Sequence, residues 1–246
     1  MISFLGLQAV TIGSALVSVA AKLPPTAIVI NRALGGGLAA PETEATVRDI
    51  LATYKEAYVE RYFFQRHPEA EPPEMVDWLV AAGLEKTRGW QKFSRGREAP
   101  PVSASDLRVE RIGPDRGFEF GRILCDSFDL GDVAVPWLAE LPGHAGWHIF
   151  MSFDGDEPAG TGTMFVQNGL AWFDFASTSP RFRRRGSQGA LLAARIKLAL
   201  DLGCAAMFTC TGEEVPGDPQ HSFRNIIKAG FSETYVRENY APPKTG

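Results

Sequence analysis

A cluster of arginine and glycine residues lies between positions 181 and 189 of the sequence. Arginine occupies four of the five positions from Arg181 to Arg185, Gly186 and Gly189 follow, and an apolar helical stretch continues to Leu200. The first turn of a helix presents N–H groups without intrahelical partners, and glycine lets a ligand approach the backbone closely. Arginine adds charge-assisted hydrogen bonds to phosphate oxygens. The sequence therefore predicts a phosphate or pyrophosphate site at this elbow.

Other phosphate-binding motifs fit the elbow less well. A P-loop requires Lys and then Ser or Thr after its second glycine, whereas Ala190 and Leu191 follow Gly189. The dinucleotide motif G-x-G-x-x-G is not supplied by "GSQG". A structural turn with solvated arginines remains an alternative.

Composition limits the function classes. The chain has 246 residues, of which 45% are hydrophobic and 22% charged, so it can form one large domain or two small ones. A net charge of -4 argues against general nucleic-acid binding. The cysteines, Cys125, Cys204 and Cys210, are odd in number and lack C-x-x-C spacing, so we expect neither a disulfide nor a zinc site, and a cytoplasmic location.

An uncharged apolar run from Met1 to Ala21 is long enough to span a membrane. It lacks the basic start of a signal peptide, and polar and glycine residues interrupt it at turn-like intervals. We therefore expect two or three short buried strands and no membrane association.

Hydrophobic periodicity predicts alternating strands and helices on both sides of a linker at Gly96–Asp106. Before the linker we expect strands at Thr26–Leu34, Arg61–Gln65 and Glu85–Arg95, a helix from Pro41 with Val47, Ile50, Leu51, Tyr54 and Tyr58 on one face, and a helix at Pro72–Gly83. After it we expect strands at Leu107–Gly113, Ala205–Thr211 and Phe231–Tyr240, three strands within His148–Ser177, and helices at Pro114–Phe128, Ala134–Leu141, Ser187–Gly203 and Pro219–Gly230.

The two halves show a weak internal repeat of strand, turn, long helix, strand, short helix and strand. We predict a partial, degenerate first domain at residues 1–96, a linker at 97–106 and a complete domain at 107–246.

The segment "TSPRFRRRGSQGALL" resembles the acetyl-coenzyme A loop of the GNAT N-acetyltransferase superfamily, V-x-P-x-x-R-x-x-G-x-G/A. Thr178, Pro180, Arg183 and Gly186 fill its first four places, and Gln188 departs from it. The later "RNIIKAGF" is similar to the superfamily's helix that ends in Gly-Phe. The resemblance implies an α+β fold in which helices flank a mixed, mostly antiparallel sheet, with a partial repeat at the N-terminus.

The same resemblance implies where acetyl-coenzyme A, the acyl-donor cosubstrate, would bind. Its pantetheine would contact the backbone at a strand end, and its pyrophosphate would bind at the elbow. The following helix would contact the pantetheine arm. These three sets are Ala176, Ser177 and Thr178; Arg183, Arg184, Arg185, Gly186, Ser187, Gln188 and Gly189; and Ser222 and Asn225.

For catalysis, the resemblance implies direct attack of an amine on the thioester, with a carboxylate as general base. Glu213 and Glu214 follow a strand at the cofactor end, and Asp174 is a second candidate. Ile226 stands where the superfamily often has the tyrosine that protonates the leaving thiolate, so Tyr235 or solvent would take this role.

We therefore expect an N-acetyltransferase that acts on an amine of a small molecule or peptide and that can form a homodimer. A non-catalytic acyl-coenzyme A sensor, favoured by Ile226, is the main alternative. Nucleic-acid binding by the arginine run is a third.

Overall fold

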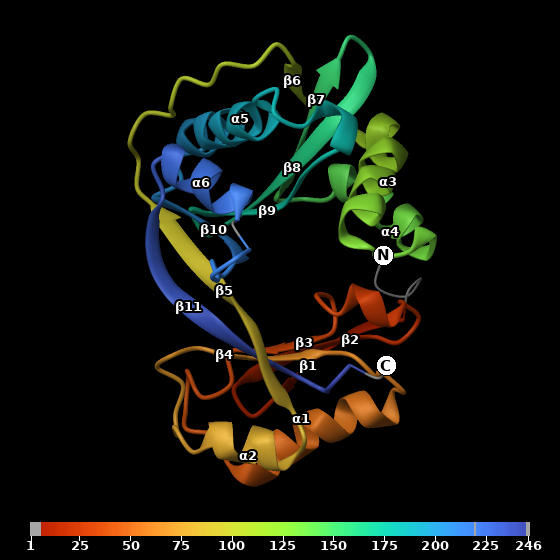
Figure 1. Ribbon diagram of the computed structural model, residues 1–246, viewed down its shortest axis with the longest axis vertical. Coiled ribbons are helices and arrows are strands. Elements are labelled where there is room, and N and C mark those ends of the chain that lie inside the picture. The colour runs from red at the N-terminus through yellow and green to blue at the C-terminus, as the bar shows by residue number, and fades with distance from the viewer. Residues whose placement is uncertain (1–5, 219, 245–246) are drawn as a thin grey trace. The chain divides into compact units, whose positions relative to one another are not determined.

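The computed structural model describes residues 6–218 and 220–244 (Figure 1). They form two compact units. The first holds the described residues up to Trp90 and from Val236 onward, and the second is Gln91–Tyr235. Two strands, β5 (Glu85–Arg95) and β11 (Ser232–Ala241), contribute residues to both. Among the described residues, no helix has the length and apolar composition that crossing a membrane requires.

The first unit is a sheet covered by two helices. Its strands are β1 (Leu7–Ile12), β2 (Ala15–Ala20), β3 (Arg32–Leu34) and β4 (Phe63–Arg66), followed in the sheet by the end of β11. The pairings are antiparallel except for the parallel pair β3–β4. A 3-10 turn lies at Pro25–Ala27, and the helices are α1 (Glu44–Glu56) and α2 (Met75–Ala81). Their apolar faces meet the sheet in a core that includes Val47, Ile50, Tyr54, Phe64, Met75 and Leu79.

Three expectations for the first unit need correction. The N-terminal region forms strands, but β1 is largely exposed because it pairs only with β2 at the sheet edge; residues 1–5 lie outside the described residues. Only Arg32–Leu34 of the expected strand Thr26–Leu34 is extended, because Ser18 donates its hydroxyl to the Ile30 carbonyl and so holds the preceding turn. Tyr58 lies beyond α1 and is 90% exposed.

The second unit has a larger sheet. Its strand order is β11-β5-β10-β9-β8-β7-β6. The strands not yet given are β6 (Arg108–Arg111), β7 (Trp147–Asp154), β8 (Glu157–Gln167), β9 (Leu170–Thr178) and β10 (Ala206–Gly212). From β6 to β9 neighbours are antiparallel, whereas β9 and β10 are parallel.

Helices flank this sheet as predicted. They are α3 (Gly117–Phe128), α4 (Val135–Ala139), α5 (Ser187–Asp201) and α6 (His221–Lys228), with 3-10 turns at Pro114–Arg116, Asp132–Ala134, Leu141–Gly143 and Pro180–Phe182. Pro219, where the last helix was expected to start, lies outside the described residues. The core between α5, α6 and the sheet includes Phe93, Met164, Phe173, Leu192, Ile196 and Phe231.

The predicted repeat is visible in the element order. In the first unit, β3, α1 and the parallel strand β4 are followed by α2 and β5. In the second, β9, α5 and the parallel strand β10 are followed by α6 and β11. The element order thus supports a mixed α+β fold that contains a partial second copy of one motif.

Candidate cosubstrate site

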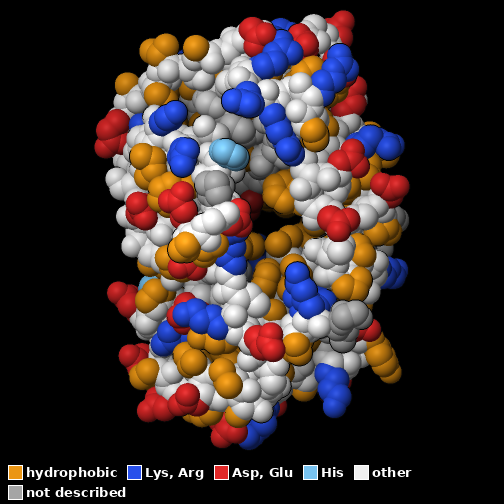
Figure 2. Space-filling view, in the orientation of Figure 1, with side chains coloured by type: hydrophobic (Ala, Val, Ile, Leu, Met, Phe, Trp, Pro, Cys, Tyr) orange, Lys and Arg blue, Asp and Glu red, His pale blue; other side chains and the backbone are white. Residues whose placement is uncertain are grey.

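A pocket of about 940 Å³ lies in the second unit, where β9 ends and α5 begins. This volume is in the range of small-molecule sites. Figure 2 shows Lys and Arg side chains, with a histidine among them, gathered over α5 and α6. Eleven of the predicted binding residues line the pocket: Ala176, Ser177, Thr178, Arg183, Arg184, Gly186, Ser187, Gln188, Gly189, Ser222 and Asn225. Residues brought together here thus come from three separate segments of the sequence.

The elbow before α5 has a backbone that only glycine accommodates readily. Gly186 has φ +80°, and a Cβ there would lie 2.2 Å from the carbonyl oxygen of Ala104. Ser105 fixes the same approach, because its hydroxyl donates to the Arg185 carbonyl at 2.8 Å. The predicted linker therefore packs directly on the elbow. No side chain caps the N-terminus of α5, which leaves its first N–H groups without a side-chain acceptor.

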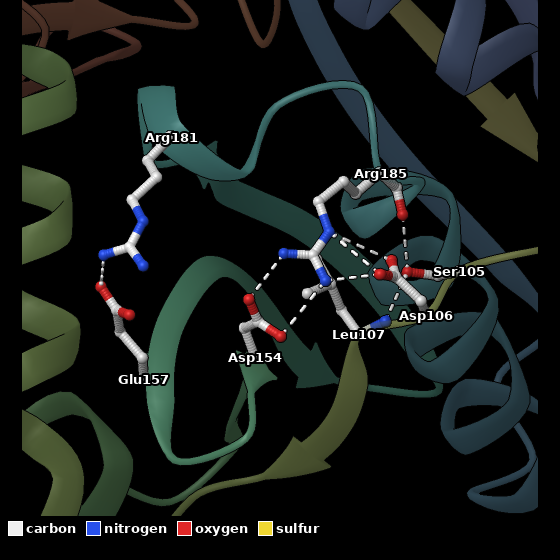
Figure 3. A network of polar contacts seen from close by, with 7 residues as sticks. All are labelled: Ser105, Asp106, Leu107, Asp154, Glu157, Arg181 and Arg185. Carbon is white, nitrogen blue, oxygen red and sulfur yellow. Dashed lines mark hydrogen bonds and ion pairs between the residues drawn. The ribbon is translucent and has the colours of Figure 1, made fainter.

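The four arginines of the elbow divide into two pairs. Arg181 pairs with Glu157 at 2.7 Å, and Arg185 binds both Asp154 (Nη1 to Oδ2, 2.7 Å) and Asp106 (Nε to Oδ2, 3.1 Å), as Figure 3 shows. The hydrogen bonds from Arg185 lower the pKa of both aspartates. Arg185 does not line the pocket, so its observed contacts are structural ones.

The other two, Arg183 and Arg184, line the pocket and are exposed. Neither forms an ion pair with a described residue; Arg183 only approaches the Thr178 carbonyl, at 3.4 Å. Two guanidinium groups and an uncapped helix N-terminus therefore face the pocket without a protein counter-charge. This arrangement can bind an anionic phosphate.

Helix α6 adds three basic residues that the sequence reasoning missed. His221, Arg224 and Lys228 line the pocket beside the predicted Ser222 and Asn225. Their spacing of three and four residues places them on one helical face. The sequence HSFRNIIK carries this signal, because its basic residues recur at helical spacing.

The two central parallel strands separate next to the pocket. Their pairing runs from Ala206–Leu170 to Phe208–Trp172 and stops there, although both strands continue. Further along, between Asp174 and Ser177, β9 carries a bulge, with Phe175 at φ +44°. Beyond Trp172 the register pairing of β9 with β10 has ended, although the Thr209 hydroxyl still donates to the Phe173 carbonyl at 3.1 Å.

Side chains from α5 hold the end of β9. Gln188 donates through Nε2 to the Ser177 carbonyl at 2.6 Å and to the Thr178 hydroxyl at 2.9 Å. The hydroxyls of Ser187 and Ser152 lie 2.8 Å apart. Gln188, the residue that departs from the family motif, thus ties the elbow helix to the strand that precedes it.

Two hydrogen bonds hold the Asp174 carboxylate just beyond the end of the β9–β10 pairing. Trp172 donates its Nε1 to one oxygen at 2.9 Å, and the Phe175 N–H donates to the other at 2.8 Å. Phe173 packs towards α5, where Arg195 stacks on its ring. Because side chains alternate along a strand, Asp174 faces away from α5.

None of the predicted catalytic residues lines the pocket, and this includes Asp174. Glu213 is half-buried and Glu214 exposed, both just after β10; Tyr235 is half-buried on β11. Ile226 is buried in the core, as its type suggests. No disulfide joins cysteines of the described residues, and burial raises the pKa of the Cys125 and Cys204 thiols, which makes both less reactive.

Comparisons with known proteins agree with this architecture. No family model and no curated protein matches the sequence. The structure is similar to a GCN5-related N-acetyltransferase from Kribbella flavida (TM-score 0.65, 16% identity, covering 97% of this chain and 90% of that one). It is also similar to a GCN5-related N-acetyltransferase from Sphaerobacter thermophilus (TM-score 0.64, 13% identity, 82% and 67%). A tandem GNAT protein from the clavulanic acid biosynthesis pathway gives a TM-score of 0.54 at 11% identity, over 82% and 70%. The chain has the GNAT fold.

Proposed function

We propose that this chain, which has the GNAT fold, is an N-acetyltransferase that uses acetyl-coenzyme A as acyl donor and an amine as acceptor. The observation that carries the proposal is the pocket, where Arg183, Arg184 and the uncapped start of α5 lie beside the end of β9, beyond its register pairing with β10. The two arginines and the start of α5 suit the pyrophosphate of coenzyme A. The end of β9 suits its pantetheine.

In the proposed reaction, the neutral amine attacks the thioester carbonyl. The new C–N bond forms, the C–S bond breaks, a base takes the proton that the amine loses, and the sulfur leaves as thiol once it gains a proton. Asp174 suits the role of base because two hydrogen bonds orient it at the strand separation. Glu213 and Glu214 remain alternative bases, and Tyr235 the proposed acid.

We propose further that the first unit binds no coenzyme A. At the elbow of α1, Thr43 caps the helix by accepting from the Thr46 N–H at 3.1 Å. The buried Glu42 carboxylate accepts from the Ser14 N–H at 2.7 Å and from the Gly37 N–H at 3.4 Å. At the start of α1, the Glu42 carboxylate and the Thr43 cap thus occupy the N–H groups that a bound anion would need.

A thiol-release assay with acetyl-coenzyme A and a panel of primary amines tests the proposed activity. Asp174→Asn should lower turnover about 10²-fold or more while affinity for coenzyme A stays nearly constant. Glu213→Gln and Glu214→Gln are the matched comparisons, and whichever variant alone loses turnover identifies the base. Binding without thiol release for any amine would favour the sensor, for which Ile226 in place of a tyrosine is the supporting feature.

Affinity for coenzyme A tests the elbow separately. Arg183→Ala and Arg184→Ala should each weaken binding about fivefold, since each removes one charge-assisted contact. Arg181→Ala is the control, because Arg181 already pairs with Glu157 and does not line the pocket. Equal affinities in all three variants would refute the elbow as the pyrophosphate site.

A further inference from the structure

The pocket holds more positive charge than a pyrophosphate needs. Arg183 and Arg184 face it from the elbow, and Arg224 and Lys228 face it from α6. No aspartate or glutamate among the described residues lines it. The chain as a whole has a net charge of -4, so this local excess is a specific feature of the pocket.

The basic face of α6 is not neutralised by carboxylates within the part of the chain that the structure describes. Arg224 and Lys228 are exposed, and neither forms an ion pair with a described residue. The helix, with sequence HSFRNIIK, contains no acidic residue. Its opposite face is anchored, since Ile226 is buried and Phe223 packs against the same core. A rigid helix therefore presents two cations and His221 to the pocket.

These cations match a second phosphate group. A pyrophosphate diester carries about two negative charges, which Arg183, Arg184 and the start of α5 can balance. A phosphomonoester adds about 1.5 to 2 negative charges at pH 7. Arg224 and Lys228, one helical turn apart, supply the corresponding positive charge.

We propose that α6 binds the 3′-phosphate of coenzyme A, so that the protein selects coenzyme A over its 3′-dephospho form. The proposal rests on the proposed function, because it assigns a second part of the same ligand to the same pocket. Arg224 provides a planar fork for two phosphate oxygens and Lys228 a compact charge. Asn225, which lies between the two, and Ser222, which precedes them on the helix, remain for the neutral parts of the ligand.

Calorimetric titration with coenzyme A and with 3′-dephospho-coenzyme A tests this assignment. The wild-type protein should bind coenzyme A about tenfold more tightly, and the preference should weaken as salt is raised. Arg224→Gln with Lys228→Gln should lower affinity for coenzyme A about tenfold and for the dephospho form less than twofold. Lys22→Gln with Lys55→Gln, which removes two exposed lysines outside the pocket, should leave both affinities unchanged.

Each outcome decides a different claim. Equal wild-type affinity for the two ligands would overturn the 3′-phosphate site and leave the proposed function standing. A preference that survives in the α6 double variant would also overturn it, since the phosphate would then bind elsewhere. If the wild-type protein binds neither ligand, the proposed function itself falls. The single variants Arg224→Gln and Lys228→Gln repeat the test should the double variant lose its fold by circular dichroism.

Discussion

Gly186→Ala should be among the most damaging small substitutions in the second unit. Two effects add at this position. An alanine at φ +80° carries a backbone cost of about 1–2 kcal/mol, and its Cβ would lie 2.2 Å from the Ala104 carbonyl oxygen. Because that neighbour is backbone, the linker must move, which by analogy with overpacked cores costs a further 1–3 kcal/mol.

Gly203→Ala provides a matched control at the other end of α5. Gly203 has φ +76°, and a Cβ there meets no atom within 4 Å. It therefore carries the backbone cost alone, about 1–2 kcal/mol. The difference between the stability losses of Gly186→Ala and Gly203→Ala therefore measures the cost of displacing the linker from the elbow.

Urea unfolding followed by circular dichroism, together with affinity for coenzyme A, measures both effects. Gly186→Ala should lower the free energy of unfolding by about 2–5 kcal/mol and weaken binding. Gly203→Ala should lower stability less and leave binding unchanged. Equal stability losses in the two variants would refute the packing argument, and unchanged binding in Gly186→Ala would refute the role of the elbow.

Three further predictions concern buried polar groups. Arg195 is 1% exposed and bonds only the Leu191 and Thr163 carbonyls, so Arg195→Met should change the free energy of unfolding by less than about 1.5 kcal/mol, whereas Arg195→Ala should cost about 3 kcal/mol in urea titrations. Burial lowers the pKa of His148 in the folded state, so as pH falls below about 6.5 the imidazole is protonated in the unfolded chain before it is protonated in the folded one. The wild type should therefore lose stability between pH 7 and 5 more steeply than His148→Gln. Glu42→Ala should lower stability by about 2 kcal/mol in thermal unfolding without changing affinity for coenzyme A. A change in affinity would contradict the proposal that the first unit binds no coenzyme A.

Local sequence patterns predicted most of the elements. The strand predicted at Glu85–Arg95 is found at those residues, and the apolar helix after Gly186 is α5. The turn at Asn168-Gly169 joins β8 to β9, with positive φ at both residues. These features depend on neighbours in sequence, which is why spacing and residue type were sufficient.

The distribution of charge in the site could not be predicted in the same way. The four arginines of the elbow are equivalent in sequence, but Arg185 is neutralised by Asp106, 79 residues away, and by Asp154, 31 residues away. The bulge at Phe175 and the early end of the β9–β10 pairing likewise depend on contacts between strands. Such long-range contacts decide which polar groups are left to bind a ligand.

Calorimetric titration of the wild-type protein and of Gly186→Glu with coenzyme A shows whether the elbow binds the pyrophosphate. We expect one site on the wild type and no measurable binding to Gly186→Glu, because its Cβ clashes with the Ala104 carbonyl oxygen and its carboxylate repels the pyrophosphate. Binding of equal strength to the two proteins, or none to the folded wild type, would contradict it.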